Sequence, residues 1–200
     1  EGVAIAERVI TRAACDRLAA DTSRIARLRG ARRITLVHKA NVLPLSCGLF
    51  RDTCRDRLVE DGWSDVLDER LVDVAALQLV ERPEAFDLIV TSNLFGDILS
   101  DLASHWGGGL GMAPSLNLGH GIALAEPVHG SAPDIAGTGR ANPLAAILSV
   151  GMLLRHHWQR PELADRLDAA VDGFLREEGS VDFGGETTRV IGQGVLQLLG

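Results

Sequence analysis

The sequence of 200 residues lacks several features that mark common classes of protein. It contains only three cysteines, an odd number, and no Cys-X-X-Cys pair. This usage argues against disulfides and structural zinc, and it predicts a reduced, cytoplasmic protein. No run of Lys and Arg occurs, and the formal net charge is -7. Nucleic acid is therefore not expected as the main partner, although a local basic patch could bind a small anion.

Long hydrophobic segments are also absent. The longest apolar run, residues 144–154, is too short to span a bilayer and is followed by Arg155, His156 and His157. It predicts a buried helix, and no membrane association is expected. No signal peptide opens the sequence, yet Glu1 is not a start methionine, which suggests that a preceding segment has been removed. With 46% hydrophobic residues, the chain can bury the core of one or two domains.

The most informative stretch is residues 91–114, TSNLFGDILSDLASHWGGGLGMAP. A strand expected at residues 86–90 leads into apolar residues spaced as in an amphipathic helix. Asp97 and Asp101 lie four residues apart on the other face of this helix. Two carboxylates so placed can hold a hard cation such as Mg²⁺ or Mn²⁺ between them. A solvated polar face is the alternative, because this spacing is common on surface helices.

Helices and short strands alternate in the first half of the chain. Thr11 is a plausible N-cap for a helix that ends near Gly30, and a second helix is expected at residues 44–60 with Pro44 in its first turn. Between these helices, a strand at residues 33–37 delivers Lys39 at its carboxyl end, where open α/β sheets bind ligands.

A further strand at residues 66–72 and a helical segment at residues 73–80 place Asp73 at a strand-to-helix junction. An N-cap role is the plain reading of Asp73 on this local pattern.

A long loop dominates the second half. Residues 107–111, GGGLG, lack the strand and helix context of a dinucleotide fingerprint and indicate a tight turn or hinge. A strand at residues 122–125 leads into residues 126–143, and a helix with Asn142 as N-cap and Pro143 as first residue follows. Because long aperiodic loops with anchored ends are usually functional, we expect this loop to bind a ligand. The tail predicts helices at residues 161–178 and 188–199, with Gly184 and Gly185 in the turn between them.

Five motifs stand out in the sequence: HKANVLPLSCGLF (38–50), NLFGDILSDLA (93–103), GLGMAPS (109–115), EPVHGSAPDIAGTGRANP (126–143) and DFGGETT (182–188). In this order they resemble motifs of the isocitrate, isopropylmalate and homoisocitrate dehydrogenases, the metal-dependent β-decarboxylating dehydrogenases. The resemblance implies an α/β, isopropylmalate dehydrogenase-like two-domain fold, not a Rossmann fold, with its N-terminal part absent. Residues 1–107 would form part of the smaller, dimer-forming domain, and residues 108–200 the C-terminal part of the larger one.

The resemblance also implies catalytic and metal-binding roles. Lys39 matches the lysine that accepts the proton of the substrate hydroxyl, directly or through water. Asp73, Asp97 and Asp101 match the three carboxylates that bind Mg²⁺ or Mn²⁺. In the family, this lysine and the first aspartate reach into the active site of the neighbouring subunit, so Lys39 and Asp73 are the expected catalytic pair. A homodimer or tetramer with shared active sites is therefore implied.

Residues 129–135 resemble the segment that wraps the adenosine of the nicotinamide cofactor. The resemblance places Asn142 at the adenine and Asn41 near the nicotinamide. Asp134 indicates NAD, because a carboxylate accepts hydrogen bonds from both ribose hydroxyls and repels the 2′-phosphate of NADP. The expected cofactor-binding residues are Asn41, Glu126, His129, Gly130, Ser131, Ala132, Asp134, Ile135 and Asn142.

The implied activity is NAD-dependent and metal-dependent oxidative decarboxylation of a 2-hydroxy acid of the substituted-malate type. A base removes the hydroxyl proton as hydride leaves for NAD, and a carboxylate then departs as carbon dioxide. A lysine serves as this base only in its neutral form, which a nearby cation favours. His38 before Lys39 favours homoisocitrate or isocitrate as substrate, with 3-isopropylmalate next. A non-catalytic regulatory subunit, or an inactive fragment of such an enzyme, is the alternative.

Three departures from the family pattern stand out. The sequence has no tyrosine, and it begins after the family segment that carries the substrate-binding arginines and the acid/base tyrosine. Val74 follows Asp73 where relatives commonly place asparagine. His105 and Trp106 replace smaller residues before the glycine turn. We therefore expect the chain to be a portion of a longer enzyme.

Overall fold

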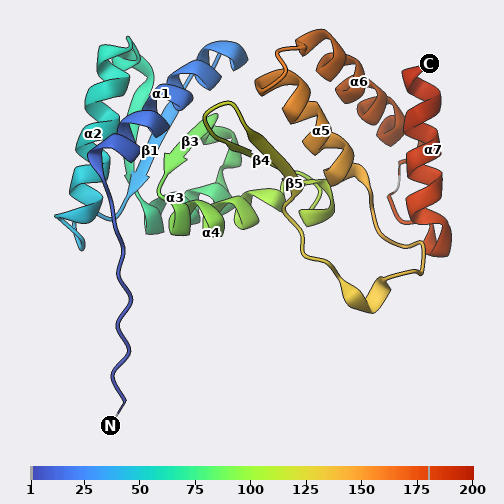
Figure 1. The fold of residues 1–200 in the computed structure, drawn as a ribbon, viewed down its shortest axis with the longest axis horizontal. Helices are drawn as coiled ribbons and strands as arrows, with labels where there is room; N and C mark the ends of the chain where they lie inside the picture. The colour runs from blue at the N-terminus through green and yellow to red at the C-terminus, as the bar shows by residue number, and fades with distance from the viewer. Residues whose placement is uncertain (1, 180) are drawn as a thin grey trace. The chain divides into compact units, whose positions relative to one another are not determined.

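The computed structural model describes residues 2–179 and 181–200, and the chain divides into two compact units. Unit 1 is Glu1–Ala103 and unit 2 is Ser104–Gly200 (Figure 1). Each unit has its own buried apolar cluster, so each is described by itself. The assignment of residues 1–107 and 108–200 to a dimer-forming and a cofactor-binding domain stays a prediction.

Unit 1 is built on a parallel sheet of three strands, in the order β2-β1-β3. The central strand β1 (Ile34–His38) pairs with β2 (Leu67–Leu71) on one side and with β3 (Leu88–Thr91) on the other. Every residue of β1 is buried, as expected for a parallel strand that is covered on both faces. Since all three strands run in the same direction, their carboxyl ends meet at one edge of the sheet.

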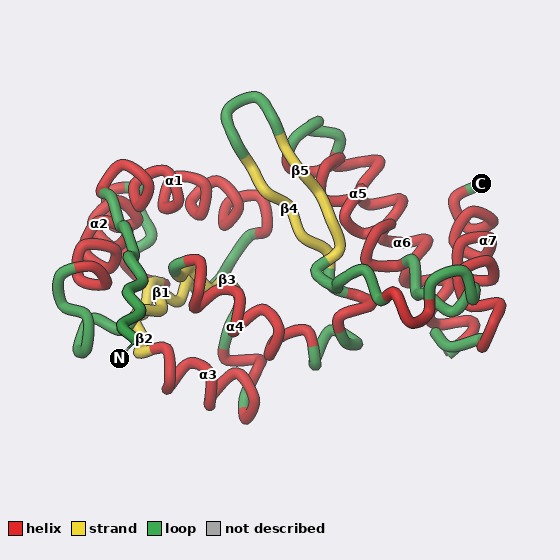
Figure 2. Tube along the Cα trace, turned by 60° about the horizontal axis from the view of Figure 1, so that its bottom comes forward, coloured by secondary structure: helices red, strands yellow, loops and turns green. Residues whose placement is uncertain are grey.

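Helices cover both faces of this sheet (Figure 2). Alternate residues of β1 point to opposite faces. On one face, Ile34 and Leu36 join a core with α1 (Arg12–Arg29) and α2 (Ser46–Glu60), and on the other Val37 packs with α3 (Val72–Glu81) and α4 (Asn93–Ser104). All three cysteines are buried as free thiols in unit 1.

Local sequence explains where the helices of unit 1 begin. The Thr11 hydroxyl accepts a hydrogen bond from Ala14 N, and Gly30 closes α1 in the left-handed region, as predicted. The prediction that Pro44 lies in the first turn of α2 is wrong. The chain first makes a turn in which Leu43 N donates to the Lys39 carbonyl over 2.9 Å, and the helix begins at Ser46.

Unit 2 combines a β-hairpin with three helices. Strands β4 (Pro114–Leu118) and β5 (Ala123–Pro127) pair in antiparallel fashion, and α5 (Leu144–His156), α6 (Pro161–Glu178) and α7 (Thr187–Leu199) follow. The sequence pattern missed β4, because its Pro and Asn residues have low strand propensity and only the pairing with β5 makes it a strand. The core of the unit consists of Leu144, Ala170, Val171, Phe174, Ile191 and Val195.

The long loop of unit 2 begins two residues later than the predicted range of 126–143 and ends at the predicted residue. Glu126 belongs to β5, so the irregular segment is residues 128–143. α5 begins at Leu144 with Pro143 in the N-cap position, one residue later than predicted. The capping hydrogen bond expected of Asn142 is present, because its Oδ1 accepts from Leu144 N over 2.9 Å. α5 is only partly buried, since Val150 is 46% exposed. Among the residues that the structure describes, no helix combines the length and apolar character needed to cross a membrane.

Candidate functional site

The carboxyl edge of the unit 1 sheet gathers the residues predicted to carry chemistry. β1 ends at His38 and β2 at Leu71, so Lys39 and Asp73 follow neighbouring strands at the same edge. β3 ends at Thr91, and α4 begins at Asn93. This edge is the usual place for ligands in open α/β sheets.

Lys39 and Asp73 form an ion pair in which the ammonium Nζ donates to Asp73 Oδ1. Asp73 is the second residue of α3 and lies within its first turn, while Leu71 occupies the N-cap position. The N-cap reading of Asp73 is therefore wrong. The hydrogen bond from Lys39, aided by the Asp73 backbone N–H, holds the pKa of the Asp73 carboxyl below its usual 3.8. Asp73 is thus a carboxylate at neutral pH.

His38 shapes the turn that presents Lys39. Its ring is 6% exposed, and its Nδ1 accepts a hydrogen bond from Ala40 N over 3.1 Å. The other ring nitrogen, Nε2, lies 3.5 Å from Glu69 Oε2 on β2. Burial lowers the pKa of His38, although Glu69 opposes the shift, so the ring is neutral at neutral pH. Sequence reasoning used His38 only as a marker of substrate and missed this contact with the Lys39 turn.

Asp97 and Asp101 lie one turn apart on α4, and both are exposed. Their carboxylate oxygens suit Mg²⁺ or Mn²⁺, so the donor type fits the predicted metal. Within residues 2–179 and 181–200, however, no three His, Cys, Asp or Glu side chains come together as a metal-binding group. Asp73 pairs with Lys39 instead of completing a set of three with the α4 pair. The metal role of these three residues stays a prediction. It requires that Asp97 and Asp101 be joined by a further ligand from outside this chain.

A second cation at this edge was not anticipated. Arg8 lies in the segment before α1, and its guanidinium donates to Ser92 Oγ over 2.5 Å and to Cys47 Sγ over 3.5 Å. The same group lies 5.0 Å from the centre of the Phe95 ring. Arg8 therefore ties the N-terminal segment to the start of α4. No sequence pattern marks it, because its partners are distant in the chain.

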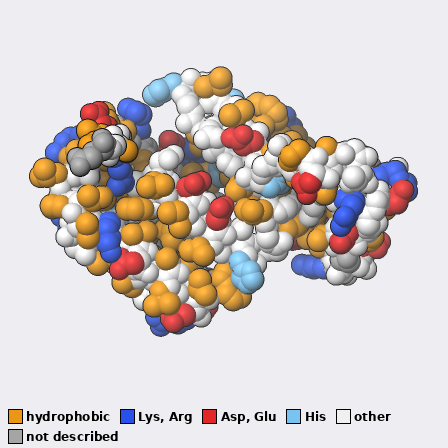
Figure 3. All heavy atoms as spheres, turned by 90° about the horizontal axis from the view of Figure 1, so that it is seen from below, with side chains coloured by type: hydrophobic (Ala, Val, Ile, Leu, Met, Phe, Trp, Pro, Cys, Tyr) orange, Lys and Arg blue, Asp and Glu red, His pale blue; other side chains and the backbone are white. Residues whose placement is uncertain are grey.

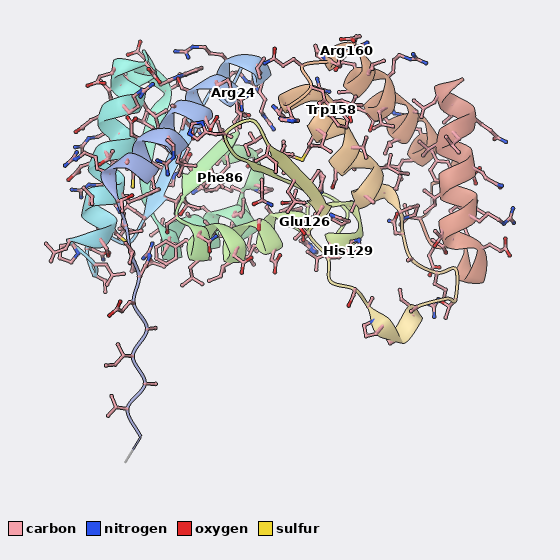
Figure 4. The ribbon with its side chains drawn as sticks, viewed as in Figure 1. Arg24, Phe86, Glu126, His129, Trp158 and Arg160 are labelled. Carbon is pink, nitrogen blue, oxygen red and sulfur yellow. The ribbon has the colours of Figure 1, made fainter. Side chains whose placement is uncertain are left out.

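Of the predicted cofactor residues of unit 2, Glu126 lies in β5 and the others follow this strand in the chain. Figure 4 labels Glu126 and His129. Glu126 Oε1 accepts a hydrogen bond from Asn117 Nδ2 on β4 over 3.4 Å, and His129 is exposed near the start of the loop. Ala132 has a backbone φ of 41°, a value that residues other than glycine rarely adopt. The one-turn helix Pro133–Ile135 follows and carries Asp134. Gly130, Ser131 and Asp134 are exposed, and Ile135 is half-buried.

The two predicted asparagines have different surroundings. Asn41 is exposed in the turn after Lys39, in unit 1. Asn142 is half-buried in unit 2, where its Oδ1 accepts from Leu144 N over 2.9 Å and its Nδ2 lies 3.7 Å from Met112 Sδ. A side-chain amide has two donor and two acceptor positions, so Asn142 keeps capacity for a ligand. The predicted site residues thus belong to both units.

The fold is that of known dehydrogenases. The crystal structure of isocitrate dehydrogenase from Methylococcus capsulatus matches with a TM-score of 0.87 and 38% identity, over 96% of this chain and 58% of that one. A β-decarboxylating dehydrogenase from Thermococcus kodakarensis matches with a TM-score of 0.83 and 41% identity, over 99% and 58% of the two chains. The predicted fold class is confirmed: this is an α/β chain of the isocitrate dehydrogenase type.

Sequence comparison gives the family. The model of the isocitrate/isopropylmalate dehydrogenase family matches residues 1–197. An isocitrate/homoisocitrate dehydrogenase of Thermus thermophilus is 50% identical over 199 residues, which are 98% of this chain and 59% of that protein. The 3-isopropylmalate dehydrogenase of Archaeoglobus fulgidus is 46% identical over 179 residues, with coverage of 89% and 54%. The chain belongs to the isocitrate/isopropylmalate dehydrogenase family and spans less than two thirds of the length of these relatives.

Proposed function

We propose that the complete protein is an NAD-dependent and Mg²⁺- or Mn²⁺-dependent dehydrogenase that decarboxylates a 2-hydroxy acid of the substituted-malate type. The observation that carries this proposal is the pair formed by Lys39 and Asp73 at the carboxyl edge of the sheet. Lys39 is the only lysine, since all the others of the 20 Lys and Arg residues are arginine. Arginine stays protonated in proteins, so the single amine lies where a reaction needs proton exchange.

Each residue of unit 1 has a distinct task in this proposal. Lys39 accepts the hydroxyl proton of the substrate. The Asp73 carboxylate orients the Lys39 amine through the observed hydrogen bond. Asp97 and Asp101 would hold the divalent ion together with Asp73 of a second copy of the chain. When bound, the ion would stabilise the negative charge that develops on the enolate oxygen.

Unit 2 supplies the binding surface for the cofactor in this proposal, and bound NAD would accept the hydride. The loop residues from His129 to Ile135 would surround the adenosine, with Asn142 at the adenine and Asn41 of unit 1 near the nicotinamide. Asp134 favours NAD over NADP because its charge repels a 2′-phosphate. The exposure of Asp134 in the structure is consistent with contact to a ribose.

A homodimer is part of the proposal, because the catalytic pair is expected to serve a neighbouring active site. The outer faces of α3 and α4 support an interface, since both expose apolar side chains. The face of the molecule shown in Figure 3 carries many hydrophobic side chains. Those exposed on the two helices are Val74, Leu77, Val80, Leu94 and Ile98.

The deciding experiment measures NADH formation by the complete protein with Mn²⁺. The substrates are homoisocitrate, isocitrate, 3-isopropylmalate and tartrate, each also tried with NADP and after removal of the metal with a chelator. We expect turnover of homoisocitrate or isocitrate with NAD, lost with the chelator and restored by Mn²⁺. A folded dimer that binds Mn²⁺ but turns over none of the four acids would instead support the second candidate, a regulatory subunit.

A further inference from the structure

The loop of residues 128–143 has little structure of its own. The main internal hydrogen bonds that the structure describes form one short turn, in which Ile135 N donates to the Ala132 carbonyl over 3.1 Å and Thr138 donates to the Ile135 carbonyl through both its N–H and its hydroxyl. Elsewhere in the loop, His129 Nδ1 lies 2.8 Å from the carbonyl of its neighbour Gly130. Nearly all its residues are exposed, and Ala132 has a positive φ. A segment with so few internal contacts needs support from outside to keep one conformation.

At the first residue of the loop, Val128 N donates to the Ala113 carbonyl over 3.0 Å. In the second half of the loop, the support comes from the start of α7. Thr188, the second residue of α7, contacts the loop twice. Its backbone N–H donates to the Gly139 carbonyl over 2.9 Å, and its hydroxyl donates to the Ala141 carbonyl over 2.5 Å. The first N–H groups of a helix have no acceptor within the helix, so the Gly139 carbonyl satisfies one of them. Figure 1 shows the loop passing beside the lower end of α7.

The loop and the preceding turn also touch through their backbones. Gly139 has a φ of +70°, and a Cβ atom at this position would lie 2.3 Å from the Gly185 carbonyl oxygen. Real Cβ contacts are never that short, so any other residue at position 139 would push the two segments apart. Two independent observations, the Thr188 hydrogen bonds and the Gly139 close approach, therefore place the same two segments in contact.

The turn that holds the loop is itself anchored in the core of unit 2. The buried Thr187 hydroxyl accepts from Phe183 N and donates to the Gly184 carbonyl, each over 2.8 Å. The Phe183 ring packs edge-to-face on Phe174, with centroids 6.2 Å apart. Contacts thus run without interruption from the apolar core, through the turn of residues 182–188, to the loop.

We propose that Thr188 is a positioning residue for NAD: it holds residues 139–141, and with them the loop, in the conformation that receives the adenosine. This inference rests on the proposed function of the loop. Thr188 does not belong to the set of residues expected to touch the cofactor. Its loss should therefore weaken NAD binding and leave the chemical step intact, since a loop that populates its binding conformation less often binds with lower apparent affinity.

The test uses the complete enzyme and three variants. Thr188→Val removes the hydroxyl but keeps the shape and the N–H, whereas Thr188→Ser keeps the hydroxyl and serves as the matched control. Gly139→Ala removes the close approach. We expect Thr188→Val to raise the Kd and KM for NAD about 2- to 10-fold, the range of one hydrogen bond, with kcat unchanged. Thr188→Ser should bind as the wild type does, and Gly139→Ala, if it folds, should bind more weakly still.

Hydrogen exchange of residues 128–143 without NAD gives a second readout. Faster exchange in Thr188→Val, together with the rise in Kd, supports the inference. Unchanged Kd overturns it, whether the exchange changes or not, because the hydrogen bonds would then serve only the stability of α7. A wild-type enzyme that binds neither NAD nor NADP would instead overturn the proposed function of the loop, and the inference with it.

Discussion

The two units present their proposed functional residues in different ways. In unit 1, Lys39 and Asp73 project from the ends of paired parallel strands whose central member is fully buried. In unit 2, the residues from His129 to Ile135 lie on an exposed loop, and distant residues of α7 hold that loop in place. In unit 1 the sheet fixes the positions of the side chains, whereas in unit 2 a few hydrogen bonds fix the backbone of the loop.

From this difference we expect the two units to affect different steps of the reaction. A side chain at a strand end is positioned precisely and can exchange a proton, so substitutions in unit 1 should affect the chemical step. A loop held by few bonds adapts to a ligand, so substitutions in unit 2 should affect affinity and choice of cofactor. Each of the following experiments tests this separation.

The largest effect is expected for Lys39→Ala. Loss of the base should lower kcat of the complete enzyme about 100- to 10,000-fold, the usual contribution of general acid–base catalysis, with the KM for NAD little changed. Steady-state kinetics measures both constants. Lys39→Arg is the control, because it keeps the positive charge beside Asp73 but cannot release its proton. If Lys39→Arg retained turnover, the role of Lys39 would be electrostatic and not that of a base.

A smaller effect is expected for Asp134→Lys in unit 2. Replacing a carboxylate that repels the 2′-phosphate by an ammonium that attracts it should shift the ratio of kcat/KM for NAD over NADP by about 10- to 100-fold, as for charged hydrogen bonds. The kcat with a saturating cofactor should change little. Asp134→Asn, which removes only the charge, should give an intermediate ratio. Unaltered NAD binding in Asp134→Lys would show that the residue does not face the ribose.

The smallest effect is the contribution of His38 to stability at low pH. Burial lowers the folded-state pKa of His38 below the unfolded value of 6.5. Between these two values the unfolded chain binds more protons, so stability falls as the pH drops through 6.5 and stops falling below the folded-state pKa.

In His38→Asn, the amide oxygen can still accept from Ala40 N but does not titrate, so this part of the pH dependence should disappear. Urea unfolding at about pH 8 and about pH 5 measures the difference between wild type and variant. Parallel pH dependences in the two proteins would mean that the His38 ring titrates normally.

The sequence predicts most elements of the fold because their signals are local. The caps of α1 follow from Thr11 and Gly30, and α6 has the predicted bounds, Pro161–Glu178. Elements that depend on distant partners were missed or misplaced. β4 exists only through its pairing with β5, and the turn after β1 delays α2 past Pro44.

The candidate site shows the same limit. The sequence pattern places Lys39 and Asp73 at strand ends, but only the strand order β2-β1-β3 makes them neighbours. Strand order depends on contacts between distant segments, so no single segment of the sequence predicts it. The αL conformation of Ala132 could not be predicted from the sequence either, because alanine disfavours this conformation and the surrounding loop must impose it. The contact between Thr188 and Ala141 joins residues 47 apart in the sequence.

Because Lys39 is the only lysine of the sequence, chemical labelling of its amine can be used to detect binding at the carboxyl edge of the unit 1 sheet. Within these 200 residues, an acylating reagent directed at lysine has a single side chain to label, and mass analysis of the peptide that contains Lys39 would distinguish this label from one on an N-terminal amine. Lys39 is only 23% exposed and bonded to Asp73, so labelling must compete with that bond. Any molecule bound at this edge of the sheet would slow the labelling, and the rate would measure occupancy without any turnover.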